Sequence, residues 1–142
     1  MLDEDLAEIR IGIYATPADT ARLAEECSAV LRGSAVPHEI SVASQEQAPE
    51  GEEMPIAEFY DELPQQWRIE NPGADPESRR IREIRIGLVT NRPKLNALRE
   101  ELTRIVCPDP EHASPCPVPW TSSCSGNDES GLGHRYASLL PG

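Results

Sequence analysis

The feature that most constrains the fold of this chain is a five-residue segment that occurs twice. The sequence Glu-Ile-Arg-Ile-Gly at residues 8–12 recurs at residues 83–87, 75 positions later. Extended without a gap, the alignment contains eight identities over the 26 residues from Glu8, with Leu23 matching Leu98. A duplicated structural unit accounts for this pattern, and convergent patterning in two strand-helix units is the alternative.

Both copies have the pattern of a strand followed by a helix. Branched apolar residues alternate in each copy, which places one row of side chains on one face of a strand. Thr16 and Asn91 then offer side-chain caps, and each is followed by a proline suited to a first helical turn. Apolar residues next recur with helical spacing, namely Leu23, Cys27, Val30 and Leu31 in the first copy and Leu95, Leu98, Leu102, Ile105 and Val106 in the second.

A further strand is expected after each helix. Residues 38–43 alternate in the manner of a strand after a helix stop at Gly33, whereas the counterpart window 115–121 is so rich in proline that it favours only a short edge strand around Val118. The sequence therefore predicts an α+β protein with a ferredoxin-like β-α-β-β-α-β sandwich built from two pseudo-symmetric βαβ halves. A small parallel doubly wound sheet is the alternative, but it needs further βα units.

The 142 residues fit a single domain with additional segments. We predict one α+β domain over residues 6–122, made of a first repeat (8–45), a long acidic insertion (46–80) and a second repeat (81–121). The Pro- and Cys-rich C-terminal segment is expected to end in a flexible tail over residues 123–142.

The insertion carries ten acidic residues against three arginines, which contributes -7 to the net charge of -12. Within it, residues 55–63 have the spacing of a short amphipathic helix. This helix is expected either to cover the open face of the sheet or to dock into a groove of another protein. The candidate partner-binding residues are Ile56, Phe59, Tyr60, Leu63 and Trp67.

Charge and hydropathy exclude several classes of function. A net charge of -12 disfavours nonspecific binding to nucleic acid, and the arginines of residues 79–85 are expected to pair with neighbouring acids. The acidic start of the chain lacks the features of a secretory signal, and no apolar run approaches the roughly 20 residues that span a bilayer. These observations predict a cytoplasmic protein that binds neither nucleic acid nor membrane.

Three cysteines and a histidine in the C-terminal segment form the candidate metal set: Cys107, His112, Cys116 and Cys124. Three thiolates and an imidazole suit tetrahedral zinc, although the Cys-x2-Cys spacing typical of zinc sites is missing. A disulfide or redox role and unrelated thiols are the alternatives. Cys27 occupies a core position of the first repeat and is therefore expected to be a buried thiol rather than a ligand. No cofactor is expected beyond this candidate zinc.

No catalytic motif emerges from the sequence. The leading hypothesis is a noncatalytic accessory or regulatory domain that binds another protein through its sheet face or its acidic insertion. Because the chain is acidic, a basic partner is favoured. The alternatives are a zinc-stabilised protein that uses the C-terminal Cys/His loop, and a small enzyme with a pocket on the open sheet face near Arg10 and Tyr14. An uncovered apolar sheet face would also favour a homodimer, whereas a covering segment would prevent one.

Overall fold

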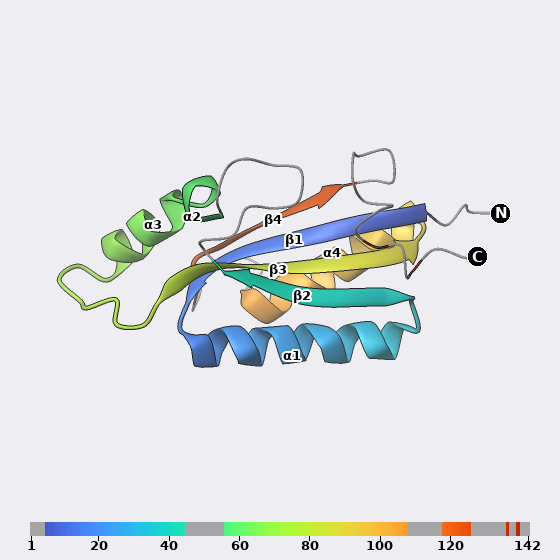
Figure 1. The fold of residues 1–142 in the computed structure, drawn as a ribbon, viewed down its shortest axis with the longest axis horizontal. Helices are drawn as coiled ribbons and strands as arrows, with labels where there is room; N and C mark the ends of the chain where they lie inside the picture. Colours follow the sequence, from blue (N-terminus) through green and yellow to red (C-terminus); the bar gives the residue numbers. More distant parts are fainter. Residues whose placement is uncertain (1–4, 45–55, 108–117, 126–135, 137–138, 140–142) are drawn as a thin grey trace.

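The computed structural model describes residues 5–44, 56–107, 118–125, 136 and 139. Within these residues the chain is an α+β protein with a four-stranded antiparallel sheet and four helices (Figure 1). The elements are β1 (Asp5–Ala15), α1 (Pro17–Ser34), β2 (His38–Ser44), α2 (Ile56–Phe59), α3 (Glu62–Glu70), β3 (Arg80–Thr90), α4 (Arg92–Val106) and β4 (Trp120–Ser125).

The strand order is β2-β3-β1-β4, and every neighbouring pair is antiparallel. Helix α1 therefore connects two parallel strands, β1 and β2. Between these two strands lies β3, which belongs to the other half of the chain. Helix α4 makes the equivalent connection from β3 to β4 around β1. The two long central strands pair over 11 residues with Arg10 opposite Arg85, so the two copies of the repeated segment lie side by side in the middle of the sheet.

One face of the sheet packs against α1 and α4. The predicted rows of alternating isoleucines on β1 and β3 are confirmed, and they meet the apolar stripes of the two helices in a buried core. The predicted caps are also confirmed: Thr16 accepts a hydrogen bond from the amide of Asp19, and Asn91 accepts one from the amide of Lys94. Helix α1 continues past Gly33 to Ser34 and ends at Ala35, whose φ of 61° is left-handed.

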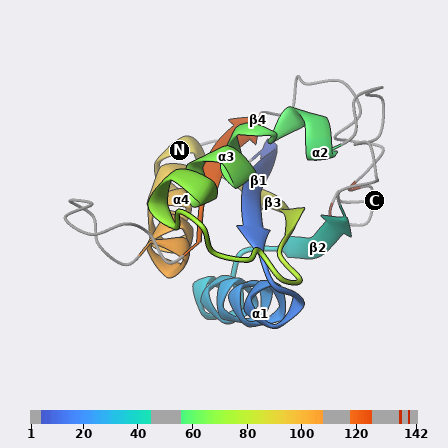
Figure 2. The ribbon, with the colours of Figure 1, turned by 90° about the vertical axis from the view of Figure 1, so that its left-hand side faces the viewer.

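We call the opposite side of the sheet the second face. Helices α2 and α3 lie across one end of it, as Figure 2 shows. Their apolar side chains pack on β1, β2 and β3 in a second buried cluster, which consists of Tyr14, Ala43, Ile56, Tyr60, Leu63, Trp67 and Ile81. Trp67 contacts Tyr14 edge-on at a centroid distance of 6.1 Å, and the Arg79 guanidinium lies 4.8 Å from the Trp67 ring centroid.

Two predicted elements differ from the structure in their limits. The helix expected over residues 55–63 is divided into α2 and α3, because Pro64 lies in the first turn of α3, where its missing N–H is tolerated, and cannot continue a helix from α2. The edge strand expected around Val118 begins at Trp120 and ends at Ser125. None of the helices in the described ranges is long and apolar enough to cross a membrane.

The packing of α3 predicts a difference between two of its apolar residues. Both residues belong to α3, but Leu63 is 1% exposed, whereas Ile69 is 80% exposed. Leu63→Ala is expected to lower the free energy of unfolding by about 2–5 kcal/mol through loss of buried volume. Ile69→Ala is the matched control and is expected to change it by no more than about 0.5 kcal/mol. Chemical denaturation measures both values, and equal small effects would contradict a structural role for α3.

Candidate functional site

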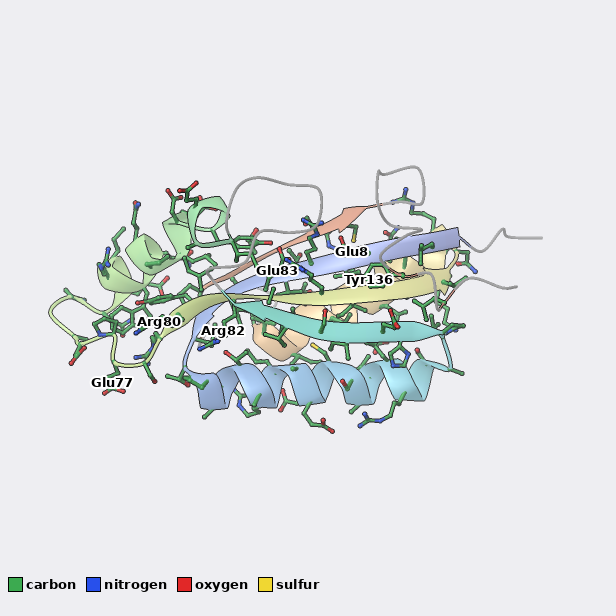
Figure 3. The ribbon with its side chains drawn as sticks, viewed as in Figure 1. Glu8, Glu77, Arg80, Arg82, Glu83 and Tyr136 are labelled. Carbon is green, nitrogen blue, oxygen red and sulfur yellow. The ribbon has the colours of Figure 1, made fainter. Side chains whose placement is uncertain are left out.

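The second face carries a polar pattern that follows from the repeat. Because the copies pair in antiparallel register, each glutamate lies opposite the glycine of the other copy: Glu8 faces Gly87, and Glu83 faces Gly12. The two arginines face each other between these pairs. Figure 3 marks Glu8 and Glu83 on the two central strands. The arrangement has an approximate two-fold axis that passes between Arg10 and Arg85.

The carboxylate of Glu83 is buried and held by two donors. Its side chain is 1% exposed. The Tyr60 hydroxyl donates a hydrogen bond to Glu83 Oε2 at 2.6 Å, and Arg85 Nε donates to Glu83 Oε1. Burying a charge is tolerated only when it is paired and hydrogen-bonded, and this carboxylate meets both conditions.

Glu8 repeats this arrangement in the other half of the sheet. Its side chain is fully buried, Arg10 Nε donates to Glu8 Oε1 at 2.6 Å, and the Tyr136 hydroxyl donates to Glu8 Oε2 at 2.5 Å. Tyr136 also packs against Leu6 on β1. Tyr136 thus performs for Glu8 the role that Tyr60 performs for Glu83.

Each tyrosine ring lies directly above a glycine. A Cβ atom added to Gly12 would lie 2.4 Å from Tyr60 Cε1, and one added to Gly87 would lie 2.3 Å from Tyr136 Cδ1. Any larger residue would collide with the ring, so glycine is required at both positions. The glycine of the repeated segment therefore makes room for the tyrosine that reaches the buried glutamate opposite.

The tyrosines occupy matching positions in the two halves. Tyr60 follows Glu8 by 52 residues, and Tyr136 follows Glu83 by 53 residues. Each ring covers the glycine of its own half, while its hydroxyl binds the glutamate of the other half. The structural repeat thus extends well beyond the 26 aligned residues.

Burial, together with the hydrogen bond to Glu83 and the charge of that residue, raises the pKa of Tyr60 well above its usual range. The charges of Arg10 and Arg85 act in the opposite direction but do not overcome these effects. Tyr60 therefore remains a protonated hydrogen-bond donor at neutral pH.

One hydrogen-bond donor of Arg85 is unused within the described residues. Its Nη2 atom is buried and has no hydrogen-bond partner among the described residues, although its side chain is 14% exposed. Ser41 on β2 pairs with Arg85, and Ser123 on β4 pairs with Arg10, so hydroxyls flank the two guanidinium groups across the sheet. We call these four residues the arginine row. Both serines are exposed.

The predicted partner-binding residues lie within the chain's own packing. Ile56, Tyr60, Leu63 and Trp67 are all buried in the cluster beneath α2 and α3, and the side chain of Phe59 lies outside the described residues. Burial of these side chains is what the covering interpretation of the insertion expects. Docking of these side chains into a groove of another protein would require α2 and α3 to leave the sheet. This partner-binding role stays a prediction.

The predicted metal set is only partly visible. Cys107 is disulfide-bonded, Cys124 is a free thiol that packs against the core beneath α4, and His112 and Cys116 lie outside the described residues. Burial raises the pKa of Cys124, while Arg99 and Arg92 act to lower it. Burial also raises the pKa of Cys27, to about 12, which fits a core thiol. The zinc site stays a prediction.

The predicted boundary of the flexible tail falls inside an ordered element. Strand β4 crosses it and continues to Ser125, and Tyr136 is 4% exposed on the second face. The domain limits otherwise remain predictions, because most of residues 126–142 lie outside the described part of the chain.

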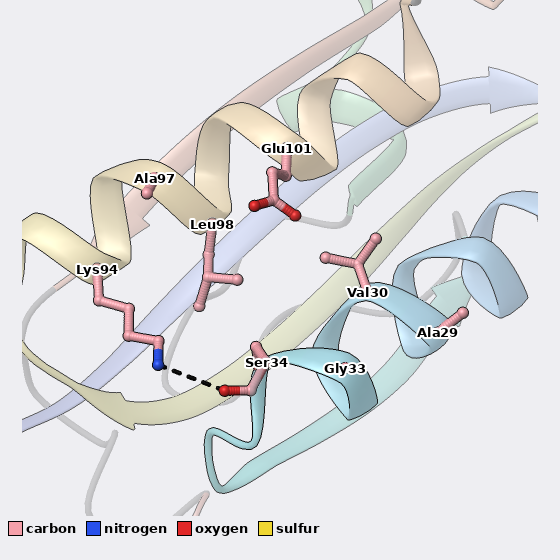
Figure 4. A pocket seen from close by; sticks show the side chains of 8 residues that line it. All are labelled: Ala29, Val30, Gly33, Ser34, Lys94, Ala97, Leu98 and Glu101. Carbon is pink, nitrogen blue, oxygen red and sulfur yellow. Dashed lines mark hydrogen bonds between the residues drawn. The ribbon is translucent and has the colours of Figure 1, made fainter.

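A separate groove lies between the outer surfaces of α1 and α4 (Figure 4). Its volume is about 440 Å³, and it is lined by Ala29, Val30, Gly33, Ser34, Lys94, Ala97, Leu98 and Glu101. The Lys94 ammonium donates to the carbonyl of Ser34 at 3.3 Å. This contact ties the start of α4 to the end of α1 beside the groove.

Sequence reasoning identified Arg10 and Tyr14 as residues of interest on the second face but missed Glu8, Glu83 and Tyr136. The available signal was the glycine that ends both copies of the repeated segment. A glycine inside a strand often marks the close approach of another group. Tyr136 carried no local signal, because it lies 128 residues from the glutamate that it binds.

No protein-family model and no curated protein matches this sequence. Among solved structures, the chain is similar to one described as "a putative aminohydrolase from methicillin resistant Staphylococcus aureus". The TM-score is 0.47 and the sequence identity is 6%, with 89% of this chain and 30% of that chain covered. The chain thus spans less than a third of that protein, and the likeness carries no functional argument.

The contact between Tyr60 and Gly12 predicts a position-specific effect of an added methyl group. Gly12→Ala is expected to lower the free energy of unfolding by about 1–3 kcal/mol, because the buried ring has no room to move aside. Gly33→Ala is the control, since nothing lies within 4 Å of its Cβ position in α1. That change should be neutral or stabilising by up to about 1 kcal/mol. Thermal denaturation compares the two, and equal effects would refute the close packing at Gly12.

The raised pKa of Tyr60 predicts a loss of stability at alkaline pH. The unfolded chain releases this proton near pH 10, whereas the folded chain retains it, so the unfolding free energy should fall as the pH rises above about 10. The expected contribution is up to about 1.4 kcal/mol per pH unit. Tyr60→Phe should remove this contribution, and at neutral pH it should cost about 1–3 kcal/mol because Glu83 loses a donor. Denaturation at several pH values measures both effects, and an identical alkaline slope in the two proteins would contradict the assignment.

Proposed function

We propose that this chain is a noncatalytic accessory domain that binds another protein through the second face of its sheet. The observation that carries the proposal is the arginine row, in which the partly exposed side chains of Arg10 and Arg85 lie between two exposed serines on the second face. The exposed Ser41 and Ser123 mark the two ends of this row.

The chemistry of the site supports binding more than catalysis. A general acid or base works best with a pKa near the operating pH, whereas the pKa of Tyr60 is raised far from neutrality. The carboxylates of Glu8 and Glu83 each accept hydrogen bonds from a tyrosine and an arginine. A small enzyme on this face remains the alternative, and it would need a reacting group beyond these pairs.

We further assign the fold to the ferredoxin-like sandwich. Support comes from the order of the strands and from the two helices that each bridge a pair of parallel strands on the same face. The cover formed by α2 and α3 over part of the second face argues against a homodimer formed through that face. A cytoplasmic location is also part of the proposal, although the disulfide of Cys107 is more usual in oxidising compartments.

The acidic charge of the chain suggests a second contribution to partner binding. Four glutamates, Glu46, Glu50, Glu52 and Glu53, precede α2 in the sequence. A basic partner would be attracted by them over a distance of about 10 Å at moderate salt, whereas contacts at the arginine row are short-ranged. The two contributions can therefore be separated by substitution and by salt.

The test starts from proteins that cross-link to the full chain in a lysate and continues with each candidate after purification. We expect one purified protein to bind the wild-type chain and to bind Arg85→Met at least about tenfold more weakly, since hydrogen bonds to charged groups are worth that factor. Arg104→Met is the matched control, because Arg104 is a half-exposed arginine on α4 that pairs with Glu100 on the same helix, away from the second face. Replacing the four glutamates by glutamine should reduce binding mainly at low salt. Loss of binding with Arg104→Met, or no effect of Arg85→Met, would overturn the proposed face.

A further inference from the structure

We infer that two copies of this chain pair through the outer edge of β2 and form one continuous sheet across a two-fold axis at Ser41. The inference concerns an edge of the sheet, so it goes beyond the function proposed for the second face and does not depend on it. Its evidence is the contrast between the two edge strands, the direction of the backbone groups of β2, and the sequence of that strand.

The β4 edge of the sheet is closed by an arginine. Tyr14 N donates to the carbonyl of Pro119 at 3.1 Å, so the alternation of an antiparallel ladder directs the carbonyl of Ser122 away from β1. Arg99 on α4 donates to this outward carbonyl at 3.0 Å and also contacts the Ser122 hydroxyl. A charged side chain on an edge carbonyl prevents another strand from pairing there.

The β2 edge lacks this cover. In the alignment of the two repeats, Arg99 of α4 corresponds to Ala24 of α1, which has no donor on its side chain. Strand β2 is the outermost strand beside α1 (Figure 1), and Val42 on it is 42% exposed. A seven-residue edge strand with an exposed valine and no covering arginine is a template for pairing with a further strand.

The backbone groups of β2 that face outward can be identified from its ladder with β3. Val89 N donates to the carbonyl of Pro37 at 3.1 Å at the start of this ladder. Because hydrogen-bonded pairs alternate along an antiparallel ladder, the odd-numbered residues of β2 bond to β3. The N–H and C=O groups of the even-numbered residues, Ile40 and Val42 among them, point outward. Nothing in the described part of the chain bonds to the outward groups of these two residues.

The sequence of β2 suits antiparallel pairing with a second copy of itself. An axis at Ser41 pairs all seven residues, from 38 to 44, and brings outward groups against outward groups. It places Ile40 of one copy opposite Val42 of the other, which covers the exposed valine. Glu39 then lies opposite Ala43, whereas an axis at Glu39 would place two carboxylates opposite each other.

Sedimentation velocity of the full chain over a range of concentrations tests the association. A single pair of edge strands makes a small interface, so we expect a monomer–dimer equilibrium with a dissociation constant on the order of 10–100 µM. The net charge of -12 on each copy opposes association, so the dimer should be tighter at higher salt. A chain that stays monomeric throughout would overturn the inference and leave the edge to an extended segment of another protein.

Two matched substitutions locate the interface. Val42→Lys places a charge on the β2 edge and should weaken the dimer at least about tenfold. Ile69→Lys makes the same kind of change at the other exposed large hydrophobic residue of the described ranges, on α3, and should leave the dimer unchanged. Thermal denaturation checks that both variants fold. A dimer that survives Val42→Lys, or that is lost with Ile69→Lys, would place the interface elsewhere and refute the inference.

Amide hydrogen exchange tests the geometry in the unmodified chain. The N–H of Ser41 bonds to β3 and should be protected at every protein concentration. The N–H groups of Ile40 and Val42 should exchange rapidly in dilute solution and slow down as the dimer forms. Exchange at Ile40 and Val42 that does not depend on concentration would contradict pairing through this edge.

Cysteine substitution tests the position of the axis. Two Ser41 residues would face each other as a non-hydrogen-bonded pair with Cα atoms about 4.5 Å apart, a separation that a disulfide can bridge. Ser41→Cys should therefore form a disulfide-linked dimer with oxidised glutathione, which is reduced as the bond forms. Glu39→Cys is the control, because four residues of offset separate the two copies of position 39 by about 13 Å. The wild-type chain gives the background from its own thiols, and equal cross-linking of the two variants would overturn the axis at Ser41.

Discussion

The rest of the structure depends on two carboxylates buried in the middle of the sheet. Glu8 and Glu83 lie on the central strands with essentially no exposure to solvent. An isolated buried charge is too costly for a domain of ordinary stability, so each must be supplied with hydrogen-bond donors. The arginine two residues further along the same strand provides one donor, and a tyrosine from a distant segment provides the other.

This requirement explains why the second face is organised as it is. Tyr60 belongs to the segment that α2 and α3 form over one end of the sheet, and the packing of Leu63 and Trp67 holds that segment against the strands. Tyr136 reaches the other end with Leu6 beneath it. The apolar clusters thus fix the two hydroxyls in position, while the glycines of the repeated segment leave space for their rings.

Much of the fold could be predicted from the sequence because its signals are local. The alternation around Ile9 and Ile84, the caps at Thr16 and Asn91, and the helical spacing that follows all report on neighbouring residues. The candidate site could not be predicted in this way, because its contacts join positions 23 and 128 residues apart in sequence. The repeated glutamate and glycine can be seen in the sequence. Their relation is clear only from the antiparallel register, which places each glutamate opposite the glycine of the other copy.

The exchange of tyrosines between the halves has a consequence for folding. Each half of the chain carries a glutamate that accepts one hydrogen bond from the arginine of its own strand and another from the tyrosine of the other half. Among the residues that the structure describes, the tyrosine donor for each buried carboxylate thus comes from the opposite half. The two halves are therefore expected to form together, as a single cooperative folding unit rather than as two independent ones.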